Sequence, residues 1–147
     1  MLTQIFEKAI TAARQDVERV TEVQAGERVT PSGWTRKQVL GHLIDSCLNN
    51  HQRFVRAAID GEYTGPDYLQ AEWVGIHGYE RMTWPRLVNY WILHNELLLE
   101  VVRNIPEDRY GAICHIDGDA PVTLEFLIND YLNHLAHHMN QIRGSGV

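Results

Sequence analysis

Four long stretches of this chain carry apolar residues at spacings of three and four, and no other feature limits the possible folds as strongly. They cover residues 2–24, 36–60, 84–105 and 124–143. Such spacing places the apolar side chains along one side of an α-helix, so each stretch is expected to be an amphipathic helix packed inward. Because no stretch is convincing as a β-strand, the sequence predicts an all-α protein, a four-helix bundle.

The ends of three of these helices are marked by residues that begin or stop helices. Thr35, Thr83 and Thr123 stand directly before the periodic stretches and are expected to be N-caps. Pro85 in the first turn supports a helix start at Thr83, and Gly61 is expected to close the second helix. The first helix is expected to continue to about residue 24.

Two connections are less regular than the helices. Residues 61–82 form a long connection, in which we expect a short helix over residues 68–74. A connection of this length permits a crossover arrangement of helices instead of a simple up-down-up-down order. Within residues 107–122, the sequence Asp117-Gly118-Asp119 predicts a tight turn or a small hairpin.

Composition limits the classes of protein that this chain can belong to. Its 147 residues fit one domain spanning residues 1–147, and its net charge of -6 disfavours nucleic acid as a partner. Cys47 and Cys114 are too few for a disulfide framework, and neither has a spaced partner that marks a catalytic thiol. Without a leader pattern or an apolar run of about eighteen residues, a cytoplasmic protein that does not contact a membrane is expected.

The last predicted helix carries two histidines at the spacing of one helical turn. His134 and His138 lie on the same face of such a helix, and two imidazoles at that spacing can hold one metal ion. Asp130, one turn earlier, is placed to accept the second ring N–H of His134. The alternative interpretation is a solvated polar face that also includes His137.

The second predicted helix carries a polar stripe among apolar residues. His42 is followed by Asn49 and Arg53, both within about 20° of its direction at about 100° per residue, and Asp45 flanks them. A lone histidine in such a setting is often a hydrogen-bonded core residue. An inward stripe of four polar side chains, however, is costly to bury unless it lines a wet or metal-occupied cleft.

Two runs of sequence carry a resemblance to a known family. Residues 34–46 read WTRKQVLGHLIDS, and residues 134–142 read HLAHHMNQI. The two runs, in this order, resemble the DinB/YfiT-like superfamily. The continuation of the first run through Asn49, Asn50, Arg53 and Phe54 is more similar to the YfiT branch than to the superfamily in general.

The resemblance implies a bundle with crossover connections, a homodimer, and a divalent metal ion held by His42, His134 and His138. Three protein ligands leave a coordination position for water or substrate, whereas structural zinc sites are normally closed by four. Imidazole ligands suit transition metals, so zinc or nickel is the expected cofactor and magnesium or calcium is not.

Two kinds of chemistry follow from the resemblance, and the residues leave both open. A metal-dependent hydrolase acting on a small-molecule substrate needs a general acid or base, for which Asp45 is the candidate. A transferase that uses a low-molecular-weight thiol such as bacillithiol or mycothiol needs an anion-binding group, for which Arg53 is the candidate. Gln141 lies on the ligand face and is placed to orient a bound water or substrate.

Two alternatives stand beside the enzyme hypothesis. Asp45 and Arg53 could form an internal ion pair or hydrogen-bond network that supports the second helix. The three-histidine site could be structural, in a noncatalytic metal-binding stress or sensor module. Of the other histidines, His77 and His115 could approach a cleft, but the sequence does not fix the position of either.

Overall fold

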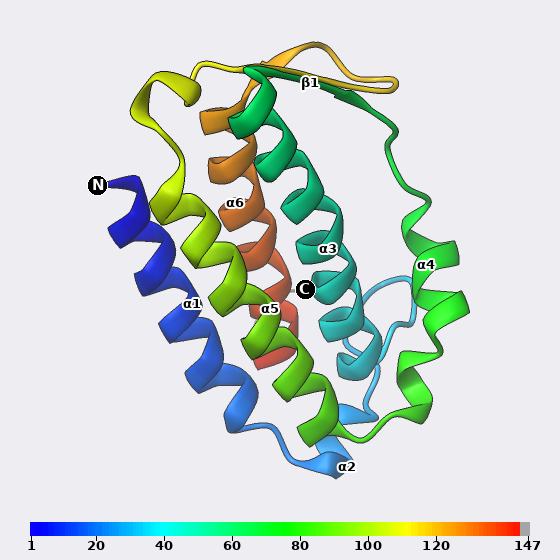
Figure 1. Cartoon of the computed structure of the whole chain (residues 1–147). Coiled ribbons are helices and arrows are strands. Elements are labelled where there is room, and N and C mark those ends of the chain that lie inside the picture. Colours follow the sequence, from blue (N-terminus) through cyan, green and yellow to red (C-terminus); the bar gives the residue numbers. More distant parts are fainter. Residues whose placement is uncertain (145–147) are drawn as a thin grey trace.

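The computed structural model describes residues 1–144 and contains six α-helices in that range, four of them long (Figure 1). The helices are α1 (Leu2–Glu18), α2 (Glu22–Ala25), α3 (Arg36–Asp60), α4 (Gln70–His77), α5 (Trp84–Asn104) and α6 (Leu124–Arg143). The long helices α1, α3, α5 and α6 form the predicted four-helix bundle. The last three residues of the expected domain lie outside the described residues.

A crossover connection sets the order of the helices in the bundle. Helix α3 packs against α5 and α6, and α1 packs against the same two helices from the other side. After α3 the chain returns along α4, so that α3 and α5 lie side by side and run in the same direction (Figure 1). The crossover arrangement permitted by the long connection is therefore confirmed.

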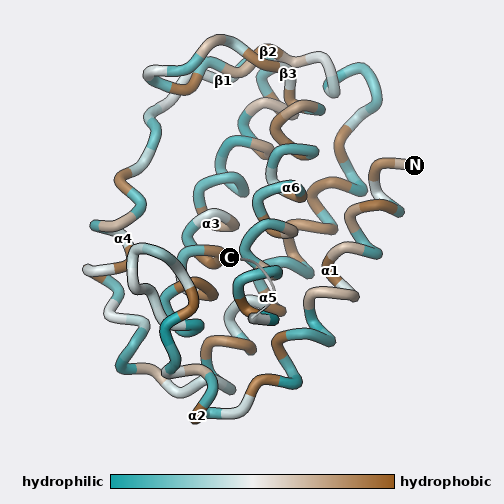
Figure 2. The backbone as a smooth tube through the Cα atoms, turned by 180° about the vertical axis from the view of Figure 1, so that it is seen from behind, coloured by the Kyte–Doolittle hydropathy of each residue, from teal (hydrophilic) through white to brown (hydrophobic). Residues whose placement is uncertain are grey.

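A small three-stranded sheet covers one end of the bundle (Figure 2). Strand β1 (Glu62–Gly65) pairs in parallel with β2 (Ile113–Ile116), which pairs antiparallel with β3 (Val122–Thr123). The predicted hairpin is confirmed, and β1 joins it as a third strand that the sequence did not predict. Strand β1 has no alternating pattern of its own and forms because the fold brings it beside β2.

The predicted caps mark most helix ends correctly. The Thr35 side chain accepts a hydrogen bond from the backbone N–H of Gln38, and the side-chain oxygen of Gln38 accepts one from the backbone N–H of Thr35. Gly61 ends α3 with a φ of +79°, and Thr123 accepts from the backbone of Phe126. These local hydrogen bonds depend only on neighbours in the sequence, which is why the sequence could predict them.

Two predicted boundaries are wrong. The first helix ends at Glu18 instead of residue 24, because Thr21 and Gln24 form a capping box that starts the separate helix α2. The short helix expected over residues 68–74 begins and ends later, over Gln70–His77, and Gly78 stops it with a φ of +63°.

Helix α5 begins after Thr83 as expected, but the Thr83 side chain does not cap it. Instead the backbone N–H of Trp84 donates to the Glu22 carboxylate at 2.8 Å, and the Trp84 indole donates to the carbonyl of Val17 at 2.8 Å. The start of α5 is therefore fixed by tertiary contacts with α1 and α2.

Most of the buried polar side chains in residues 1–144 lie along one side of α3, and the others are Asn95 of α5 and Gln141 of α6. None of the helices in residues 1–144 is long and apolar enough to cross a membrane.

Several polar side chains of α3 are buried. They are His42, Asp45, Ser46, Asn50 and Arg53. The predicted inward polar stripe is thus present. It faces α6 on one side and, on the other, residues 62–83, which return along α3 and contain α4 (the returning segment).

Gly41 lets the returning segment lie close to α3. A Cβ atom at this position would lie 2.0 Å from Cδ2 of Tyr79, in the short 3₁₀ helix η1 (Tyr79–Arg81) that follows α4. The ring of Tyr79 therefore occupies space that any side chain at Gly41 would need.

Replacing Gly41 by alanine is expected to destabilise the protein by about 1–3 kcal/mol, because the ring of Tyr79 must move. Urea unfolding of the two proteins measures the difference. Gly75→Ala in α4 is the matched control, since no atom lies within 4 Å of its added Cβ. That control should be neutral or more stable by up to about 1 kcal/mol. Equal free energies of unfolding for both variants would contradict the contact.

Candidate metal centre

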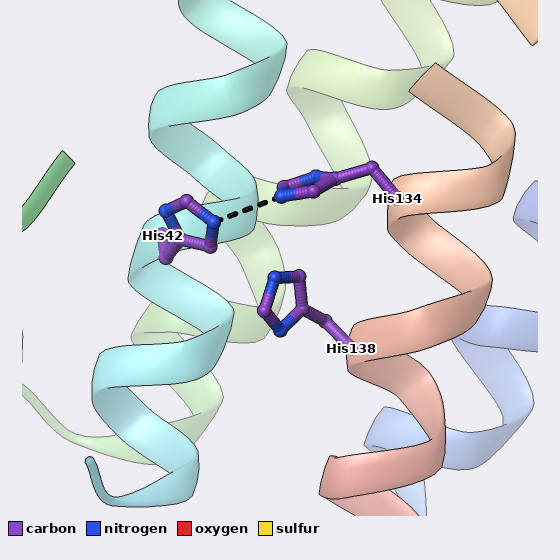
Figure 3. Close-up of side chains that lie close together, drawn as sticks. All are labelled: His42, His134 and His138. Atoms are coloured by element: carbon purple, nitrogen blue, oxygen red, sulfur yellow. Dashed lines mark hydrogen bonds between the residues drawn. The ribbon is translucent and has the colours of Figure 1, made fainter. Parts of the chain in front are cut away.

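Three histidines from two helices converge in the interior. His42 comes from α3, and His134 and His138 come from successive turns of α6 (Figure 3). One ring nitrogen from each lies within 4.8 Å of the others. The Nε2 atoms of His42 and His134 are 2.9 Å apart. The structure therefore brings together the three histidines that the sequence singled out as metal ligands.

The tautomer of His138 is set by its neighbour Gln141. The Nδ1 atom of His138 lies 2.7 Å from the side-chain oxygen of Gln141. An amide oxygen only accepts hydrogen bonds, so Nδ1 carries the proton and Nε2 is left bare. Bare Nε2 is the form in which imidazole binds a metal ion, and Gln141 holds His138 in that form.

Burial keeps the three rings neutral. It lowers the pKa of His42 to about 3 and that of His134 to about 4, with repulsion from neighbouring histidines adding to both shifts. Burial also lowers the pKa of His138, although the hydrogen bond to Gln141 works in the opposite direction. Near pH 7 the cluster is therefore three neutral imidazoles, ready to act as ligands.

This donor set fits a divalent transition metal. Ring nitrogens about 2.0–2.1 Å from a zinc ion at tetrahedral angles lie roughly 3.3 Å from one another. The observed separation of 2.9 Å between His42 and His134 needs only a small outward shift to reach that value. His137 is exposed and does not belong to the cluster. Its ring contacts the ring of His138.

Asp45 lies on the other flank of α3. Its side chain is fully buried, and Oδ1 accepts hydrogen bonds from the Tyr79 hydroxyl at 2.6 Å and from Nδ1 of His77 at 3.0 Å. Burial raises the pKa of this carboxyl, and the two donors counteract the shift. Asp45 thus links α3 to the returning segment.

Arg53 lines a cavity of about 280 Å³ that extends to one of the three histidines. The cavity is lined by both Arg53 and His134, together with Ser46, Asn50 and Tyr68. Arg53 is 8% exposed, and within residues 1–144 its ion pair is with Asp67, at 3.7 Å. The structural alternative of an ion pair between Asp45 and Arg53 does not form in this part of the chain.

Asp130, expected to bind the second ring nitrogen of His134, lies elsewhere. It is exposed and lines the same cavity, and no hydrogen bond joins it to His134 in the described part of the chain.

The two cysteines do not take part in this chemistry as nucleophiles. Burial raises the pKa of Cys47 to about 12 and that of Cys114 above its ordinary value. Neither thiol supplies a thiolate near pH 7.

The site includes residues that the sequence analysis did not assign. Tyr79 and His77 hold Asp45, Trp34 lies against the ring of His42 with centroids 5.3 Å apart, and Tyr68 stands beneath the Arg53 guanidinium. One signal pointed to such a contact: Gly41, a helix-interior glycine on the flank of the polar stripe, indicates the close approach of another group.

A family model described as the DinB superfamily matches residues 5–142 of this chain. YfiT of Bacillus subtilis (strain 168), which is named as a candidate metal-dependent hydrolase, is 26% identical over 151 residues. That alignment covers 95% of this chain and 79% of YfiT.

Two solved structures share the fold. YfiT from Bacillus subtilis, described as having an unusual four-helix bundle topology, superposes with a TM-score of 0.84 at 22% identity, covering 96% of this chain and 81% of that one. The mycothiol-dependent maleylpyruvate isomerase superposes with a TM-score of 0.81 at 14% identity, covering 96% of this chain and 59% of the isomerase.

The buried histidines predict how the stability of the metal-free protein depends on pH. Unfolded, these rings have a pKa of about 6.5 and take up protons below it. Folded, His42 and His134 stay neutral down to about pH 3 and 4. The contribution of these two rings to the free energy of unfolding is therefore fully present above about pH 6.5 and is lost as the pH falls toward 4.

Thermal unfolding in the presence of a chelator, at a series of pH values, measures this dependence. We expect the Tm of the wild-type protein to fall more steeply between about pH 6.5 and 4 than that of His42→Gln, in which one of the rings is absent. Parallel curves for the two proteins would show that His42 does not stay neutral in the folded state.

Proposed function

The chain belongs to the DinB superfamily, and from this premise we propose that it is a metal-dependent enzyme whose ion is held by His42, His134 and His138. The observation that carries the proposal is the convergence of three neutral imidazoles within 4.8 Å, beside a cavity lined by an arginine. We further propose zinc or nickel as the ion, and a cytoplasmic homodimer as the form of the protein.

The chemistry of such a centre follows from its open coordination. A bound ion with three imidazole ligands would lower the pKa of a water or thiol in the fourth position toward neutrality. In this chain Gln141 keeps His138 in the ligating tautomer, so we propose that Gln141 acts by positioning that ligand. The buried protein thiols do not compete as nucleophiles, because burial raises the pKa of both.

We propose that the substrate or cosubstrate is a small acidic molecule bound by Arg53. A guanidinium has five N–H donors, and a long ion pair with Asp67 and a 3.5 Å contact with the Pro66 carbonyl leave most of them available. Arg53 and His134 line the same cavity, together with Asp67, Asp119 and Asp130, so a carboxylate held by Arg53 would share that cavity with His134. This arrangement favours transfer to or from a low-molecular-weight thiol with acidic groups, and the likeness in fold to a mycothiol-dependent enzyme supports it.

Hydrolysis is the second candidate, favoured by the candidate metal-dependent hydrolase YfiT among the relatives. In that reaction we propose Asp45 as the group that accepts or donates a proton. Its Oδ1 atom is already engaged by Tyr79 and His77, so only Oδ2 remains for this role. Thiol transfer therefore has the stronger support from the geometry.

Protein purified without a histidine tag and without added metal should contain about one transition-metal ion per chain. His42→Ala, His134→Ala and His138→Ala should each lose it, because two imidazoles bind far more weakly than three. Elemental analysis measures the content. His137→Ala is the control and should keep the metal, since His137 lies outside the cluster.

Wild-type protein that refuses zinc and nickel would contradict the metal proposal. Protein that binds the ion, unfolds at much lower temperature without it, and turns over neither thiols with electrophiles nor hydrolysable substrates would point to the noncatalytic alternative.

Arg53→Gln should raise the KM for an acidic thiol by about 10–100-fold, because a charge-assisted hydrogen bond contributes about 1.5–3 kcal/mol. Steady-state conjugation of mycothiol or bacillithiol to a small electrophile measures this. Arg56→Gln, three residues along α3 and exposed, is the matched control and should leave the KM unchanged. Equal KM values for the two variants would remove Arg53 from the binding site.

A further inference from the structure

Two complementary polar atoms are buried one turn apart on α3, and neither has a partner. They are Nδ1 of His42 and Oδ2 of Asp45. His42 is 1% exposed and Asp45 is fully buried. Side chains three residues apart on a helix are neighbours on its surface, so the two atoms come from adjacent positions. Leaving a buried donor or acceptor unpaired is energetically costly, so each atom requires a partner.

The orientation of His42 makes its Nδ1 atom a donor. The ring points Nε2 toward His134 and turns Nδ1 away from the other two histidines (Figure 3). A ring that offers Nε2 to a metal ion carries its proton on Nδ1. An oxygen acceptor is therefore needed on the side of α3 that faces away from α6, the flank on which Asp45 lies.

The orientation of Asp45 is fixed from the opposite side. Tyr79 and His77 both donate to Oδ1, and Tyr79 is itself held in the space that Gly41 leaves open. With Oδ1 anchored in this way, Oδ2 is the oxygen that remains available to α3. Metal-ligating histidines commonly donate their second N–H to a carboxylate, which fixes the ring and raises its basicity.

We propose that Asp45 is the positioning residue of His42, with Oδ2 accepting the Nδ1–H of that ring through one buried water. The proposal rests on the proposed function in one respect: it takes the metal to bind Nε2 of His42. It differs from the role of Asp45 as a general acid or base, because here the carboxylate acts through the ligand and does not touch the substrate.

The contacts that Asp45 makes with Tyr79 and His77 extend to the outside of the bundle. His77, whose side chain is 37% exposed, lines an open cavity of about 600 Å³ together with Trp73 and Tyr68. Tyr68 also lines the smaller cavity beside His134. His77 therefore connects the Asp45 carboxylate to this outer cavity.

Asp45→Asn tests the proposal through metal affinity. Competition with a chromogenic chelator should show about 10–100-fold weaker zinc binding with a stoichiometry still near one, as expected when an outer partner of a ligand is changed. Asp130→Asn removes the same charge one turn from His134 and should change the affinity by less than about threefold. Equal affinities for the two variants would overturn the proposal.

Tyr79→Phe separates affinity from stability. It removes a donor to Asp45 but keeps the carboxylate and the hydrogen bond from His77, so urea unfolding should show a loss of stability while zinc affinity stays within about threefold of wild type. If Tyr79→Phe weakened zinc binding as much as Asp45→Asn, the effect would belong to the packing of the returning segment, and the proposed role of Asp45 would be wrong.

Nitrogen-15 NMR of the wild-type protein tests the hydrogen bond without a variant, in case Asp45→Asn does not fold. His42 should be found with its proton on Nδ1, in slow exchange with water, both with zinc and without it. A bare or zinc-bound Nδ1 would overturn the proposal. Wild-type protein that binds no metal, but still shows this protected Nδ1–H, would contradict the proposed function while supporting the contact with Asp45.

Discussion

The burial of polar side chains along α3 is the constraint on which the rest of this structure depends. A helix in a bundle normally buries an apolar stripe, but α3 also buries an imidazole, a carboxylate and a guanidinium, in His42, Asp45 and Arg53. Each of these groups requires partners once water is removed. The partners come from α6 on one side and from the returning segment on the other, so the site and the packing of α3 are formed by the same contacts.

The crossover connection supplies one of those two sides. In a bundle with short loops, α3 would be followed directly by an antiparallel neighbour, and the flank that carries Asp45 would face solvent. Because residues 62–83 return along α3 before α5 begins, His77 and Tyr79 cover this flank (Figure 1). The topology therefore has a chemical consequence, since it provides donors for a carboxylate that lies one turn from His42 of the three-histidine cluster.

The two flanks of α3 differ in what they offer to a small molecule. On the flank that faces α6, Arg53 and His134 line one cavity, and the guanidinium keeps hydrogen-bonding capacity beyond its pair with Asp67. On the opposite flank, the carboxylate of Asp45 is turned toward Tyr79 and His77. The cavity beside His134 is lined by Arg53 and by the carboxylates of Asp67, Asp119 and Asp130, whereas the carboxylate of Asp45 is turned toward the returning segment.

The sequence by itself determined the helices, their caps and the identity of the three converging histidines. Periodicity and capping are local, so Thr35, Gly61 and Thr123 could be placed before any contact was known. The spacing of His134 and His138 fixed their common face, and the resemblance to a family added His42. These features depend on neighbours within a turn or two of helix, which is the range over which sequence spacing translates into geometry.

Tertiary structure alone decided the partners of the polar groups. Asp45 binds Tyr79 and His77, Arg53 binds Asp67, and β1 pairs with a strand far along the chain. None of these contacts has a fixed spacing in the sequence, because each depends on how the returning segment lies across α3. The sequence therefore specified which groups could carry the chemistry, and the packing of distant segments determined which of them meet.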